Sequence, residues 1–158
     1  MNYSIQSIPE NYKMTAFGVT LEDFNDWAGN ARKTADKKAE ITANGKLAEL
    51  LALADGQEYQ INYVVDRKGW RGFGVMGEFD AEGAVVLEFL AGDYLVVSGT
   101  GTDKDRLADE ITGQVFGGLL QRITDYKYVG PGNSTFVRAA ANGEFYGEMW
   151  LRVTKVES

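Results

Sequence analysis

The chain has 158 residues, of which 44% are hydrophobic and 12% aromatic, so it can bury a core and falls outside the disordered class. Its 16 basic and 23 acidic residues give a net charge of −7, which argues against nucleic acid as a partner. The absence of histidine and cysteine excludes Ser-His-Asp and Cys-His catalysis, histidine-bound metals and disulfides. We expect one cytoplasmic domain over residues 1–158, with no cofactor, no metal, no signal peptide and no membrane-spanning segment.

The first half of the chain predicts the order strand, helix, strand, strand. The predicted elements are a strand over 12–19, a helical region over 21–54 that breaks near 43–45, and strands over 58–66 and 69–79 joined by a turn at 67–69. Thr20 can cap the helix, and Glu22 and Asp23 suit the positive end of its dipole. Four apolar residues recur at helical spacing before Gly56 ends the helix: Leu47, Leu50, Leu51 and Ala54.

The second half predicts the same order again. Extended chain over 84–90 turns at Gly92 and Asp93 into a strand over 92–101. A helix follows, and one apolar stripe runs along it: Leu107, Ile111, Val115, Leu119 and Ile123. The segment 128–134 predicts a loop. The last two strands, over 135–141 and 145–153, are joined across Asn142 and Gly143, because Asn-Gly is a strong hairpin signal.

Strands grouped on one layer with helices on one face define an α+β fold. The two strand-helix-strand-strand repeats, with halves at about 1–80 and 81–158, share their order of elements rather than their sequence. We expect the halves to meet across a pseudo-two-fold axis, with their strands antiparallel and a central groove between them.

The stretch "GFGVMG" (72–77) fits the dinucleotide-binding pattern G-x-G-x-x-G. The pattern requires a helix to open directly after it, because the helix N-terminus binds the pyrophosphate. The residues that follow predict a turn and another strand, so we predict that the motif binds no nucleotide. Two explanations remain for the glycines. They leave a bare patch beside Trp70 that a ligand can approach, or they relieve crowding against a helix and bend the sheet.

In the last strand, side chains alternate between two faces. Tyr146, Glu148, Trp150 and Arg152 share one face, whereas Met149 and its neighbours share the other. A carboxylate flanked by two aromatic rings suits an organic cation, which is attracted by the rings and by the charge. The alternative is an ordinary exposed face of an antiparallel sheet. Arg152 is also long enough to reach back and neutralise Glu148.

The stretch "FLAGDYLVVSGTG", the helix after it and the closing "GEMWLRV" resemble the gyrase-inhibitor-like small-molecule-binding family. That family includes effector-binding domains of AraC-type and MerR-type transcription regulators. Gly92, Tyr94 and Gly99 match its first element, and Glu148 with Trp150 match its last strand. The resemblance implies a curved sheet around a central pocket, with Glu148 facing cationic, drug-like ligands. No DNA-binding segment precedes the match, so we expect a stand-alone binder.

Two features depart from the family pattern. The penultimate strand of the family carries a glutamate and a nearby tyrosine, and "STFVRAA" has neither. The last strand of the family ends with a proline, where this chain has Arg152. Both departures concern the charge of the ligand more than the fold.

Our leading hypothesis is that the chain is a sensor or sequestering protein. It is expected to bind a small aromatic or amphipathic molecule, preferentially a cation, in a multidrug-type pocket between its halves. The residues expected to line the pocket are Tyr63, Trp70, Tyr94, Tyr146, Glu148 and Trp150. One alternative is a hydrolase of a reactive small molecule, with Glu148 as base and Tyr63 or Tyr94 as acid. The other alternative is a protein-interaction domain whose acidic face meets a basic partner.

Overall fold

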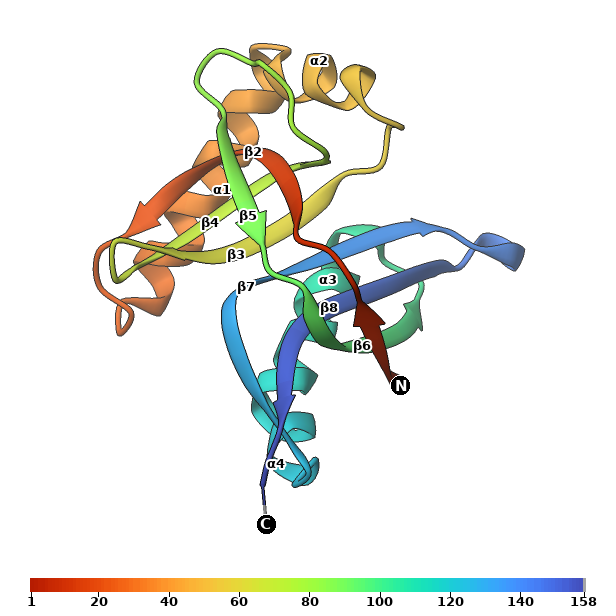
Figure 1. The fold of residues 1–158 in the computed structure, drawn as a ribbon. Coiled ribbons are helices and arrows are strands. Elements are labelled where there is room, and N and C mark those ends of the chain that lie inside the picture. The colour runs from red at the N-terminus through yellow and green to blue at the C-terminus, as the bar shows by residue number, and fades with distance from the viewer. Residues whose placement is uncertain (158) are drawn as a thin grey trace. The chain divides into compact units, whose positions relative to one another are not determined.

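The structure is a computed structural model that describes residues 1–157. The chain divides into two compact units (Figure 1). Unit 2 is Tyr12–Phe89, and unit 1 combines Met1–Asn11 with the chain from Leu90 onward. The single domain over 1–158, with halves at about 1–80 and 81–158, stays a prediction.

Unit 2 is an antiparallel sheet in the order β3-β4-β2-β5 with two helices on one face. Its elements are β2 (Tyr12–Leu21), α1 (Trp27–Ala43), α2 (Lys46–Leu53), β3 (Tyr59–Val65), β4 (Lys68–Met76) and β5 (Val85–Phe89). The helices bury their apolar sides against the sheet in one cluster: Phe17, Ile41, Leu47, Leu50, Phe73 and Val75. The other face of the sheet carries a second buried cluster: Met14, Ala16, Ile61, Trp70, Leu87 and Phe89.

The sequence predicted that the first helix begins at Leu21 with Thr20 as its cap. This prediction is wrong. Strand β2 continues to Leu21, and Thr20 pairs with Trp70 of β4. Helix α1 begins only after Asp26, whose carboxylate accepts a hydrogen bond from an N–H of the first turn. A polar side chain does cap the helix, as predicted, but the residue is Asp26. Thr20 cannot cap it because pairing with β4 keeps that segment extended.

Two turns of unit 2 show how backbone conformation sets the ends of its elements. The predicted break near 43–45 is confirmed, because α1 and α2 are separate helices and Gly45 has a φ of +79°. The β3–β4 turn lies at Asp66 and Arg67, with φ values of +51° and +67°, and not at 67–69. Positive φ at both central residues matches the twist of the flanking strands.

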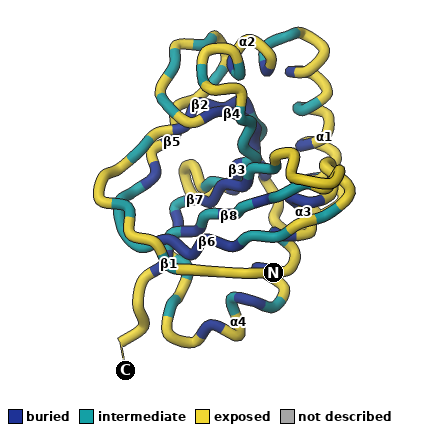
Figure 2. Tube along the Cα trace, turned by 90° about the vertical axis from the view of Figure 1, so that its right-hand side faces the viewer, coloured by how far each residue is buried: buried dark blue, intermediate teal, exposed yellow. Residues whose placement is uncertain are grey.

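Unit 1 is an antiparallel sheet in the order β1-β6-β8-β7 with one helical segment on one face. Its elements are β1 (Asn2–Ile8), β6 (Gly92–Gly101), α3 (Lys104–Gln114), the π-helical turn η1 (Val115–Leu119), α4 (Leu120–Arg122), β7 (Tyr126–Ala139), the 3-10 turn η2 (Ala141–Gly143) and β8 (Phe145–Lys155). The predicted helical stripe is confirmed, since all five of its residues are buried against the strands. Strand β1, which the sequence did not predict, is exposed along most of its length (Figure 2).

Strand β7 is longer than the sequence predicted. It begins at Tyr126 and includes the segment 128–134, which was predicted to be a loop. Its register against β8 shifts between Tyr128 and Asn133, so an irregularity of the ladder accommodates these residues. The hairpin at Asn142 and Gly143 is confirmed, and both residues have positive φ.

Both units follow the order strand, helix, strand, strand, so the predicted α+β repeat is confirmed. In each unit a fourth strand pairs with the first strand of the repeat: β5 with β2, and β1 with β6. Among residues 1–157, no helix has both the length and the apolar composition needed to cross a bilayer.

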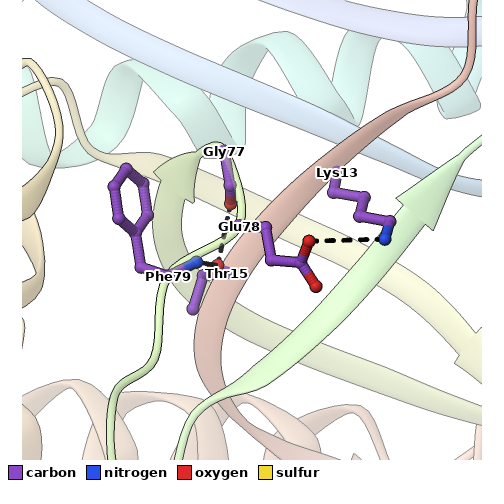
Figure 3. Close-up of polar contacts among 5 residues, drawn as sticks. All are labelled: Lys13, Thr15, Gly77, Glu78 and Phe79. Atoms are coloured by element: carbon purple, nitrogen blue, oxygen red, sulfur yellow. Dashed lines mark hydrogen bonds and ion pairs between the residues drawn. The ribbon is translucent and has the colours of Figure 1, made fainter.

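The "GFGVMG" stretch runs through β4 and ends in a turn that is hydrogen-bonded to β2 (Figure 3). The buried Thr15 donates a hydrogen bond to the carbonyl of Gly77 (2.8 Å) and accepts one from the N–H of Phe79 (3.0 Å). Gly77 has a φ of +111°, which favours glycine. At the surface, Lys13 and Glu78 form an ion pair at 3.4 Å. The chain therefore turns back across β2, and no helix opens where a dinucleotide motif would require one.

We expect Thr15→Val to lower the free energy of unfolding by about 1–3 kcal/mol, because two backbone groups lose their hydrogen-bond partner. Thr20→Val is the matched control, since Thr20 is exposed on the same strand. Urea unfolding of both variants measures the difference. Equal stability of the two variants would show that the Thr15 hydroxyl does not hold this turn.

Candidate functional site

Tyr146, Glu148 and Trp150 lie on the face of the unit 1 sheet opposite α3. Met149 and Leu151 alternate with them and pack in the core beneath the helix. The three side chains are half-buried. The alternation that the sequence predicted for the last strand is thus confirmed.

The carboxylate of Glu148 is held by its two neighbours on this face. The hydroxyl of Tyr146 donates to Oε2 at 2.5 Å, and the indole N–H of Trp150 donates to Oε1 at 2.7 Å. Both donors are neutral, so they satisfy the oxygens without cancelling the charge. None of the ion pairs among residues 1–157 involves Glu148. The site therefore presents a negative charge framed by two aromatic rings.

The sequence left open that Arg152 reaches back and neutralises Glu148. In the structure it does not. Its Nε donates to the carbonyl of Ala91 (3.1 Å), and its NH1 donates to the carbonyl of Gly130 (3.3 Å). Residues four apart on a strand are separated by about 13 Å. These two backbone acceptors hold the guanidinium at its own end of the strand.

Tyr94 is also part of this site. It is fully buried on β6, and its hydroxyl donates to the carbonyl of Leu90 at 2.6 Å. Its ring centroid lies 6.1 Å from that of Trp150, with the planes tilted by 53°. Tyr94 thus supports the indole that holds Glu148, and four of the six predicted site residues come together in unit 1.

Tyr63 and Trp70, the other two predicted site residues, belong to unit 2. They are cross-strand partners on the face of that sheet opposite its helices. The hydroxyl of Tyr63 donates to the carbonyl of Glu88 at 2.5 Å, and its ring meets Phe89 edge-on at 5.4 Å. The convergence of all six residues on one concave site stays a prediction.

The glycines beside Trp70 do not leave the bare patch that the sequence suggested. Gly72 and Gly18 are cross-strand partners, and the ring of Trp70 covers both of them. A Cβ atom on either glycine would overlap that ring. Gly72 and Gly18 therefore make room for the indole of their own sheet, which is a close approach of the kind that glycine in a strand often marks. A Cβ atom on Gly74 would instead overlap the carbonyl oxygen of Thr15 and the neighbouring Ala16.

Three further residues that were not predicted from the sequence surround Glu148. Register places Ser98 of β6 and Phe136 of β7 directly opposite Glu148, on its two sides. The guanidinium carbon of Arg138 lies 5.0 Å from the Tyr146 ring centroid and 5.8 Å from that of Phe136. Alternation within 135–141 could have placed Phe136 and Arg138 on one face. Only the register between the strands shows that this face is the one with Glu148.

The hydrogen bond to Glu148 raises the pKa of the Tyr146 hydroxyl above its ordinary value of 10. Burial and the negative charge of the carboxylate act in the same direction, whereas a hydrogen bond with Ser98 and the charge of Arg138 act against it. The phenol consequently keeps its proton near neutral pH and remains a donor to Glu148.

We expect Glu148→Gln to lower the pKa of Tyr146 toward 10, because a neutral amide replaces the carboxylate. A raised pKa means that the folded protein holds this proton more tightly than the unfolded chain does. The associated stability is therefore fully present below pH 10 and is lost as the pH rises through the folded-state pKa. The free energy of unfolding of wild type should therefore fall more steeply above pH 10 than that of Glu148→Gln.

Tyrosinate absorbance and urea unfolding, each measured below and above pH 10, test this expectation. Tyr146→Phe isolates the contribution of this hydroxyl from that of the other tyrosines. If Glu148→Gln titrates as the wild type does, the bond to Glu148 is not what raises the Tyr146 pKa.

No family model matches the sequence, and no curated protein matches it. The structure is similar to that of SAV2435 bound to tetraphenylphosphonium, with 15% identity, 98% of this chain and 94% of that chain covered, and a TM-score of 0.75. It is similar to an integron cassette protein from the mobile metagenome of Vibrio cholerae, with 15% identity, coverage of 96% and 95%, and a TM-score of 0.69. It also resembles the C-terminal domain of EcmrR, with 11% identity, 98% of each chain covered and a TM-score of 0.56. These likenesses establish the fold, and they confirm the gyrase-inhibitor-like fold that the sequence resemblance implied.

Proposed function

We propose that this chain binds small aromatic or amphipathic organic cations at the face formed by Tyr146, Glu148 and Trp150. One observation carries the proposal: a carboxylate is fixed between two aromatic rings by neutral donors and has no ion-pair partner among residues 1–157. We further propose that the chain acts as a sensor or sequestering protein in the cytoplasm, a location that the lack of cysteine fits.

The geometry favours one chemical class of cation. The donors from Tyr146 and Trp150 already take an acceptor position on each oxygen of Glu148. Charge and ring faces therefore contribute more to recognition than a pattern of hydrogen bonds does. Phosphonium and quaternary ammonium ions, which have no N–H donor, fit this site because the ring quadrupole attracts them directly.

One of the similar structures supports this choice. SAV2435 is solved bound to tetraphenylphosphonium, a cation that carries only phenyl groups on phosphorus. EcmrR, whose C-terminal domain has a similar fold, is solved in a complex with DNA, so the fold also occurs within a DNA-bound protein. Tetraphenylphosphonium is accordingly the probe with which to test binding.

The hydrolase alternative receives less support from the geometry. It needs Tyr63 or Tyr94 as an acid beside Glu148, and both hydroxyls donate to backbone carbonyls. The tyrosine hydroxyl on Glu148 is that of Tyr146. Docking of a basic protein partner stays a prediction, and competition of such a partner with the probe would reveal a shared face.

We expect Glu148→Gln to weaken tetraphenylphosphonium binding by roughly 1–3 kcal/mol, because it keeps the size of the side chain and removes its charge. Glu144→Gln is the matched control, since Glu144 is an exposed carboxylate just before β8. Calorimetry or tryptophan quenching of wild type and both variants gives the affinities.

The same titrations with tetraphenylsilane, a neutral molecule with the same four phenyl groups around a tetrahedral centre, separate charge from shape. Wild type should prefer the cation, and Glu148→Gln should leave the neutral probe nearly unaffected. Equal effects of Glu148→Gln and Glu144→Gln on the cation would contradict the proposal, and so would equal affinity of wild type for both probes.

A further inference from the structure

We propose that Arg138 acts as an internal cation that occupies the aromatic surface beside Glu148 and competes there with a bound ligand. It thereby sets which cations bind. The inference rests on the proposed function, because competition requires that a cation binds this face.

Register and distance place Arg138 at the site. Strands β7 and β8 pair Arg138 directly with Tyr146, and Phe136 directly with Glu148. The guanidinium carbon lies 5.0 Å from the Tyr146 ring centroid and 5.8 Å from the Phe136 ring centroid, both within the range of cation–π attraction. Those two rings are themselves 6.4 Å apart. The guanidinium thus occupies ring surface that a lipophilic cation beside Glu148 would use.

Within the described part of the chain, residues 1–157, the charge of Arg138 has no carboxylate partner. None of the ion pairs among residues 1–157 includes it, and its side chain is exposed. A solvated guanidinium over a ring is held weakly, and its long, flexible stem lets it leave without disturbing the backbone. A cation that covers more ring surface and loses less hydration can therefore displace it.

Displacement gives Arg138 a role in selectivity. Small or strongly hydrated cations gain little from the rings and must overcome both the occupied surface and the like charge of the guanidinium. Large lipophilic cations gain enough from the rings to replace it. Arg138 consequently discriminates between cations of the same charge, whereas Glu148 discriminates between charged and neutral molecules.

The test removes the charge of Arg138 and keeps its stem. Arg138→Met should bind tetraphenylphosphonium about two- to fivefold more tightly than wild type, the range expected from losing an exposed cation–π competitor. Arg122→Met is the matched control, because Arg122 is an exposed arginine at the end of α4 and its loss changes the net charge equally. Its affinity should stay close to that of wild type.

Two further measurements separate competition from a structural role. Tetraphenylborate, an anion of the same shape, should bind Arg138→Met less well than wild type. In wild type, the side-chain N–H signal of Arg138 should shift on addition of tetraphenylphosphonium as the guanidinium leaves the rings. Arg138→Gln repeats the titrations if the methionine variant is less stable.

The outcomes distinguish this inference from the proposed function. If wild type binds the probe, Glu148→Gln weakens binding and Arg138→Met equals Arg122→Met, then only the competition by Arg138 is overturned. Weaker binding by Arg138→Met with its fold intact also overturns it, because the guanidinium would then support the ligand. If wild type does not bind tetraphenylphosphonium, both proposals are wrong.

Discussion

The two hydrogen bonds that Glu148 accepts from its strand neighbours fix the arrangement on which the proposed binding chemistry depends. Hydrogen bonds to a carboxylate are stronger than those between neutral groups, so they orient both rings as well as the charge. The alternate residues of β8 pack in the core against α3. This packing fixes which face of the strand is buried, so Glu148 and its neighbours stay on the opposite face. A face arranged before the ligand arrives loses less conformational entropy on binding.

The acidity of the whole chain is not what makes this face a candidate. Its β7 and β8 side chains include Arg138, Arg152 and Glu148, and Lys127 pairs with Thr154 toward the end of β8. Arg152 donates hydrogen bonds to backbone carbonyls, whereas the guanidinium of Arg138 contacts aromatic rings. Glu148 accepts hydrogen bonds from neutral donors. Under the proposed function, selectivity follows from how each charge is held rather than from the net charge of −7. Local partners decide which charges remain available to a ligand.

Local periodicity was sufficient to predict the β8 face with Glu148 and Trp150 and the buried stripe of the second helix, because both follow from side-chain spacing within one element. It could not show that Arg138 lies over Tyr146, since that depends on the register of two strands. The helix predicted to start after Thr20 failed for the same reason: pairing with β4 keeps the segment extended. Contacts between elements, rather than propensities within them, account for what the sequence left open.

A crystal structure of the chain with tetraphenylphosphonium would show whether a cation binds between the rings that hold Glu148. We expect the phosphonium beside Glu148, with phenyl groups against Tyr146 and Trp150 and the phosphorus within about 6 Å of one of these rings. The hydrogen bonds from both residues to the carboxylate should persist, and the guanidinium of Arg138 should have left the rings. A phosphonium bound elsewhere, with this face unchanged, would contradict the assignment of the site.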